Sequence, residues 1–167
     1  MFKNISTFSD KSAFNINNCK VKVQRYAKVH VVLVRARHLA KLNSNGKSSD
    51  PYCQISIGKE KVTSNMVSKC INPEWKESFD FNWYAGYGDE LKITLWNKNY
   101  WDLPVDDCMG NTTIDLNHLE VEETHHIWKR LENGKGQIFI LLTISGTTSE
   151  DSITNLKAME YKLERYI

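Results

Sequence analysis

Long apolar runs are missing from this 167-residue chain. The longest, Val31–Val34 and Ile138–Leu142, fall far short of the ~20 consecutive apolar residues that a bilayer-spanning helix needs. The first seven residues also lack the continuous apolar segment of a secretory signal. We therefore expect no membrane-spanning helix and no export of the protein.

Closely spaced cysteines are also lacking. The chain has four cysteines, Cys19, Cys53, Cys70 and Cys108, and no two of them form a Cys-x-x-Cys pair. This spacing argues against a disulfide framework or a zinc site and favours free thiols in a reducing compartment. Together with the missing signal segment, it predicts a cytoplasmic protein that is at most peripheral to a membrane.

Neither sign of charge dominates, because 22 Lys and Arg residues oppose 20 Asp and Glu residues. This balance, without a concentrated basic stripe, argues against a nucleic-acid partner. Catalytic signatures are absent too: there is no Gly-rich phosphate loop, Gly-x-Ser-x-Gly elbow or His-Glu-x-x-His motif. His125 and His126 would point to opposite faces of a strand, so they do not converge on one metal ion. We expect neither enzymatic activity nor a small-molecule substrate.

The sequence does contain a series of short β-branched or aromatic runs separated by turn-forming clusters. Eight runs are predicted as strands: residues 28–35, 51–57, 61–67, 77–83, 90–96, 109–115, 124–130 and 137–145. Their spacing predicts an all-β fold, an eight-stranded antiparallel β-sandwich, with room for a helical turn only at 116–123. We expect most of the tryptophans in or beside these strands to pack in the core, namely Trp75, Trp83, Trp96 and Trp128.

Both ends of the chain differ from this central part, which we place at residues 27–146. Residues 1–26 carry five basic side chains against one acidic side chain and few apolar ones, so they are predicted to be a flexible basic leader. Residues 147–167 are predicted to form a short amphipathic helix or a linker. The positions of the helical stripe are Ile153, Leu156, Glu160, Leu163 and Ile167.

Three motifs in the central part are informative in combination. The first is Gly46-Lys47-Ser48-Ser49-Asp50-Pro51-Tyr52, the second is Asn72-Pro73-Glu74-Trp75, and the third is Trp96-Asn97-Lys98-Asn99 followed by Asp106-Asp107-Cys108-Met109-Gly110. With these motifs the chain resembles a C2 domain, most closely those of the multiple C2 and transmembrane-domain proteins. The resemblance implies a sandwich of the circularly permuted (type II) strand order that binds phospholipid membranes, often through calcium.

By this resemblance, five positions correspond to the calcium ligands of C2 domains: Asn43, Asp50, Asn97, Asn99 and Asp107. Three of them are amides, so the site carries a charge of −2 where five carboxylates would give −5. An amide oxygen can coordinate calcium, but it contributes a dipole where a carboxylate contributes a full charge, so the site is predicted to be degenerate, with weak calcium binding or none. An extra serine in the first loop and a longer third loop leave open whether Asp102 or Asp106 restores some charge.

The longer third loop carries four large apolar residues at a predicted tip of the sandwich: Tyr100, Trp101, Leu103 and Val105. They are candidates for insertion into a bilayer, and the alternatives are local packing or contact with a protein. A possible headgroup patch comprises Lys59, Lys61 and Lys69, for which solvated strand faces are the alternative.

The sequence thus predicts a non-catalytic module that docks on or tethers acidic phospholipid membranes, with no cofactor and little or no dependence on calcium. Two alternatives stay open. One is a C2 scaffold that binds a protein and no membrane, and the other is calcium-triggered phospholipid binding.

Overall fold

The computed structural model describes residues 26–99 and 105–146. Several sequence predictions lie outside these residues: the basic leader up to residue 25, the C-terminal helix, Asp102, and three of the four tip residues, Tyr100, Trp101 and Leu103. The structure therefore bears on the central part of the chain and, within the tip, on Val105.

The described residues form eight strands, in the order predicted from the sequence. The strands are β1 (Tyr26–Arg37), β2 (Pro51–Ile57), β3 (Glu60–Thr63), β4 (Glu74–Tyr84), β5 (Glu90–Asn97), β6 (Asp107–Asp115), β7 (Thr124–Arg130) and β8 (Gln137–Gly146). The 3-10 turn η2 (Leu116–His118) falls in the 116–123 region where a helical turn was expected. None of the elements in this part of the chain is a helix long and apolar enough to cross a bilayer.

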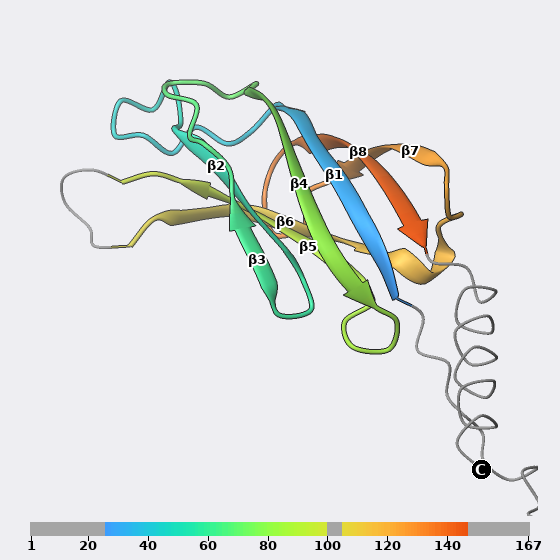
Figure 1. Cartoon of the computed structure of the whole chain (residues 1–167). Helices are drawn as coiled ribbons and strands as arrows, with labels where there is room; N and C mark the ends of the chain where they lie inside the picture. The colour runs from blue at the N-terminus through green and yellow to red at the C-terminus, as the bar shows by residue number, and fades with distance from the viewer. Residues whose placement is uncertain (1–25, 100–104, 147–167) are drawn as a thin grey trace, which may run out of the picture.

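The strands form two four-stranded antiparallel sheets that pack face to face (Figure 1). Sheet A has the order β4-β1-β8-β7 and sheet B has the order β3-β2-β5-β6. The first and last strands are neighbours, with Val31 opposite Leu142, as the permuted type II order requires. The predicted fold class is therefore confirmed.

Side-chain alternation explains why these residues form a sandwich. Along β2, for example, Cys53, Ile55 and Ile57 are buried while the residues between them are partly exposed. The period of two places one apolar row of each strand between the sheets. The core so formed includes Trp75 and Trp83, as predicted.

Trp96 is only partly buried and does not belong to the core cluster, contrary to the prediction. Trp128 departs from the core prediction as well. It lies on the outer face of sheet A, where its side chain is 37% exposed, opposite Phe139 of β8. The physical reason is the alternation of β7, in which Ile127 packs against the core and its neighbour must face outwards.

The connections between strands give the sandwich two different ends. Residues 38–50, residues 64–73 and the described ends of the β5–β6 connection (98–99 and 105–106) meet at one end, which we call the loop end. Figure 1 shows the first two of these connections side by side. The start of β1 and the end of β8 lie together at the opposite end, where Ala27 pairs with Gly146. Residues far apart in the sequence therefore meet at the loop end.

Candidate functional site at the loop end

The five predicted ligand positions are brought together at the loop end. The Nδ2 of Asn43 donates to Oδ2 of Asp50 over 3.2 Å, and the backbone N–H of Asp50 donates to Oδ1 of Asn97 over 2.7 Å. Asn97 Nδ2 lies 3.4 Å from Oδ1 of Asn99, and Asn97 pairs across the sheet with Asp107. The sequence motifs therefore located one spatial cluster, which we call the amide cluster.

Hydrogen bonds within the protein already engage the oxygens of this cluster. Asp50 is buried, and its two carboxylate oxygens accept from the backbone N–H of Lys69 and from the Asn43 amide. Asn97 is completely buried, and its oxygen accepts from Asp50. Polar groups buried in this way must find partners, and these hydrogen bonds supply them from within the protein.

The extra serine of the first loop has a structural role that the sequence did not reveal. Ser49 is fully buried, and its hydroxyl accepts from the backbone N–H of Leu42 over 2.8 Å and donates to the carbonyl of Ala40 over 2.7 Å. Ser48 Oγ lies 3.2 Å from Asn43 Nδ2. The two serines thus fix the shape of the loop that positions Asn43.

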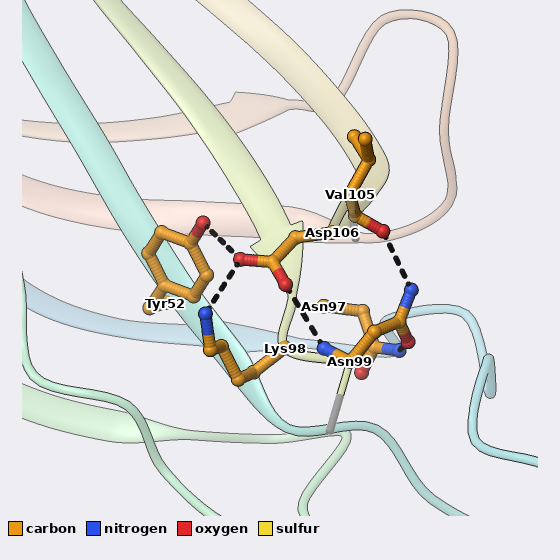
Figure 2. A network of polar contacts seen from close by, with 6 residues as sticks. All are labelled: Tyr52, Asn97, Lys98, Asn99, Val105 and Asp106. Atoms are coloured by element: carbon orange, nitrogen blue, oxygen red, sulfur yellow. Dashed lines mark hydrogen bonds and ion pairs between the residues drawn. The ribbon is translucent and has the colours of Figure 1, made fainter. Parts of the chain in front are cut away.

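Asp106 belongs to a second polar network (Figure 2). Its Oδ2 accepts from the Tyr52 hydroxyl over 2.7 Å and from Lys98 Nζ over 3.2 Å, while its Oδ1 accepts from the backbone N–H of Asn99 over 3.0 Å. Asn99 Nδ2 in turn donates to the carbonyl of Val105 over 3.0 Å. This carboxylate therefore holds the two described ends of the β5–β6 connection together. Neither Tyr52 nor Lys98 was identified as a site residue from the sequence, although both stand within its motifs.

The network shifts the pKa values of its two acidic groups in opposite directions. Desolvation, the hydrogen bond to Asp106 and the charge of that carboxylate raise the pKa of Tyr52 from 10.0 to about 12. Desolvation alone would raise the pKa of Asp106, but the Asn99 N–H, the Tyr52 hydroxyl and Lys98 hold it below its ordinary value. At neutral pH the pair is therefore a neutral phenol that donates to a carboxylate.

A pH titration tests this network. We expect the Tyr52 phenol to ionise about two pH units later than an ordinary tyrosine, because burial disfavours the phenolate and the hydroxyl donates to the Asp106 carboxylate. The difference in ultraviolet absorbance between wild type and Tyr52→Phe measures that ionisation, and Asp106→Asn should shift it back towards pH 10. Because the folded-state pKa is raised, the stabilisation due to Tyr52 should disappear as pH rises from 10 through 12. A difference spectrum that titrates near pH 10 in wild type would contradict the network.

Two further observations concern metals and the tip. Within residues 26–99 and 105–146, no three His, Cys, Asp or Glu side chains gather closely enough to hold a metal ion. Val105, the one described residue of the predicted tip, is 67% exposed.

The three lysines of the predicted headgroup patch occupy different places. Lys69 lies at the loop end, next to Asp50. Lys61 lies on β3 opposite Ser56, and Lys59 lies in the β2–β3 turn at the other end of the sandwich. All three are exposed, but Lys59 and Lys69 are separated by the length of β2.

Comparisons with known proteins agree with the fold and the motifs. The family model described as "C2 domain" matches residues 27–131. Multiple C2 and transmembrane domain-containing protein 1 of Mus musculus is 34% identical over 145 residues, which cover 83% of this chain and 15% of the relative. The corresponding Drosophila melanogaster protein is 34% identical over 132 residues, which cover 79% of this chain and 13% of the relative. The chain thus spans about a seventh of the length of these relatives.

A solved structure gives the same result. A calcium-bound structure of two C2 domains of extended synaptotagmin 2 superposes with a TM-score of 0.64 at 27% identity. The match covers 71% of this chain and 45% of that one. This chain belongs to the C2 domain family and is similar to the C2 domains of the multiple C2 and transmembrane domain-containing proteins.

Proposed function

We propose that this C2 domain is a non-catalytic module that docks on or tethers acidic phospholipid membranes through its loop end, with a degenerate calcium site. Membership of the C2 family suggests membrane or lipid binding. The observation that carries the finer proposal is the amide cluster, in which an amide and a backbone N–H group engage both oxygens of the buried Asp50 carboxylate. In this proposal the protein is cytoplasmic and peripheral to the membrane, with no cofactor.

The donor set of the amide cluster does not suit calcium. A calcium ion takes six to eight oxygen ligands and is favoured by anionic ones. Here both oxygens of Asp50 already accept hydrogen bonds, and Asn43 directs its NH₂ group towards that carboxylate. Asp106, which was considered as a substitute ligand, is held by Tyr52 and Lys98. Docking in this proposal therefore does not proceed through a metal ion.

Apolar insertion supplies the affinity instead. Val105 is exposed beside the amide cluster, and the sequence places Tyr100, Trp101 and Leu103 in the same connection. Removing a valine or leucine side chain from water contributes about 1.5–3 kcal/mol when burial is complete. Lys69 at the loop end is in position to attract anionic headgroups, at about 1 kcal/mol per basic residue near the surface.

Vesicle sedimentation of the full 167-residue chain tests the proposal. We expect binding to phosphatidylcholine vesicles that contain phosphatidylserine, equally in calcium and in a calcium chelator. Val105→Ser should weaken binding about fivefold to tenfold because a partly inserted apolar side chain is lost. Trp101→Ser should weaken it further because tryptophan buries more area at the interface.

Val121→Ser is the matched control, because Val121 is a 55% exposed valine outside the loop end, and it should bind vesicles like wild type. Binding that requires calcium would support calcium-triggered docking instead. No binding under either condition would support the scaffold that binds a protein and no membrane.

A further inference from the structure

Arginine and aromatic side chains from three strands form a stack on the outer face of sheet A. The rings of Trp128 (β7) and Phe139 (β8) are stacked with centroids 5.0 Å apart and planes at 21°. The guanidinium carbons of Arg37 and Arg35, both on β1, lie 4.2 and 5.6 Å from the Trp128 ring centroid. We call these four residues, with the nearby Arg130, the arginine shoulder.

The shoulder is partly preorganised. Arg37 Nε and Nη2 donate to Oε1 of Gln137 over 3.2 and 2.8 Å, which fixes the plane of its guanidinium over the indole. Arg130 extends the basic surface, because it pairs across the sheet with Gln137. Because the Arg37 guanidinium is held in place before binding, less conformational entropy is lost when a ligand binds.

A local shift in β1 creates this surface. Val29, Val31 and Leu33 point into the core, and the register changes between Leu33 and Arg35. After the change Ala36 is the buried residue, so Arg35 and Arg37 face outwards. Without this irregularity the alternation would direct both arginines towards the core.

Charge on the shoulder favours an anionic partner. This face has a cleft of about 220 Å³, which is lined by Arg35, Ala36, Arg37, Asn72, Glu74 and Trp128. The carboxylate in this lining, Glu74, lies 2.8 Å from Lys76 Nζ and is thereby paired. Glu74 also lies opposite Arg35 across the β1–β4 pair. With Lys76 and Arg130 counted beside Arg35 and Arg37, four cationic side chains oppose this one carboxylate, which leaves an excess of three positive charges.

The position of the shoulder identifies the anion. Arg37 is the last residue of β1 and Arg130 the last residue of β7, so both lie where their strands reach the loop end. A domain held on a bilayer by its loop end has these side chains beside the headgroups. Guanidinium forks match phosphate oxygens, and a tryptophan flanked by arginine is suited to the boundary between water and lipid.

We propose that the arginine shoulder is a second membrane contact, which binds the phosphate groups of anionic phospholipids when the loop end docks. This inference rests on the proposed membrane function. It adds a second contact surface, on the outer face of sheet A, and a requirement for anionic lipids. It assigns separate tasks to the two surfaces, with apolar insertion at the tip and headgroup selection at the shoulder.

Sedimentation with vesicles of phosphatidylcholine alone, or with added phosphatidylserine, tests this assignment. We expect Arg35→Gln with Arg37→Gln to weaken binding to the anionic vesicles roughly 25-fold, at about fivefold per arginine, and to leave the weak binding to neutral vesicles unchanged. The Arg35 side chain makes no hydrogen bond in the described structure, so the single variant Arg35→Gln keeps the Arg37–Gln137 contact. Its affinity for the anionic vesicles should fall about fivefold.

Two comparisons separate this inference from general charge effects. Lys28→Gln with Lys92→Gln removes the same charge from exposed positions away from the loop end. This control pair should weaken binding to the anionic vesicles less than about fivefold, against about 25-fold for the arginine pair. Arg35→Lys with Arg37→Lys keeps the positive charge but removes the planar guanidinium groups. The affinity of this variant for anionic vesicles should lie between those of wild type and the double glutamine variant.

The possible outcomes distinguish failure of the two proposals. If Val105→Ser weakens binding and the arginine variants do not, the shoulder assignment is overturned while membrane docking stands, and the face is left for a protein partner. If the lysine pair matters as much as the arginine pair, the shoulder is also overturned. If wild type binds neither kind of vesicle, both proposals fail.

Discussion

Replacing Asn43, Asn97 and Asn99 together by aspartate is expected to create calcium binding and to destabilise the protein when calcium is chelated. In wild type, amide N–H groups face oxygen across the Asn43–Asp50 and Asn97–Asn99 contacts, at 3.2 and 3.4 Å. In the variant each contact becomes one between carboxylate oxygens. The charge of the five positions changes from −2 to −5, and each like-charge contact near 4 Å costs about 1–4 kcal/mol, depending on the effective dielectric.

Thermal denaturation with and without calcium measures both effects. We expect wild type to unfold at the same temperature in calcium and in chelator. The triple variant should unfold about 10 °C lower in chelator and recover this loss when calcium binds, because ligand binding to the folded state stabilises it. Isothermal calorimetry should detect heat from calcium binding in the variant alone.

The matched control adds three carboxylates at exposed positions outside the cluster, as Thr63→Asp, Asn133→Asp and Ser145→Asp. This control should show no calcium-dependent recovery. A calcium-dependent shift in wild type itself would refute the degenerate site, and a triple variant that stays insensitive to calcium would mean that the five positions do not form a calcium site at all.

Gly134→Ala is expected to lower the free energy of unfolding by about 3 kcal/mol, because there is no space for a methyl group. A Cβ at this position would lie 1.9 Å from the carbonyl oxygen of Met109 and 2.8 Å from the Cα of Gly110. Both are backbone atoms of β6, so no side chain can rotate away to relieve the clash. The same region joins the two sheets, since Asn111 and Glu132 exchange backbone hydrogen bonds of 3.0 and 2.7 Å.

Chemical denaturation followed by circular dichroism checks this prediction, with Gly146→Ala as the control. A Cβ on Gly146 would have its nearest neighbour at 4.0 Å, from Ala27, which is an ordinary contact distance. The control should therefore unfold within about 0.5 kcal/mol of wild type. Equal stability of the two variants would show that the turn after β7 moves easily away from β6.

The end of β3 illustrates why strand boundaries were less predictable than strands. The sequence run predicted a strand over 61–67, but β3 ends at Thr63. At the next position the Ser64 hydroxyl accepts from the backbone N–H of Cys53 over 2.9 Å, in place of a backbone carbonyl. Asn65 then donates its backbone N–H to Glu77 of β4. A side chain that competes for backbone hydrogen bonds ends the ladder, and this competition depends on neighbours distant in the sequence.

The candidate site likewise has features that the sequence predicted and features that it did not. The resemblance of the motifs to those of C2 domains predicted one site for five positions, and the structure places them together at the loop end: Asn43, Asp50, Asn97, Asn99 and Asp107. The partners of these residues were not predictable. The backbone N–H that completes Asp50 comes from Lys69, which was considered only for its charge.

The amino-acid sequence by itself determined the all-β class and the order of the strands, because alternation and turn residues act over a few neighbouring positions. Its motifs located the loop end through their resemblance to C2 domains. Only the tertiary structure decided that Asp106 faces Tyr52 and that Trp128 meets Arg37. Such contacts depend on the register of paired strands, and a one-residue irregularity, as after Leu33, turns the following side chains to the other face of the sheet.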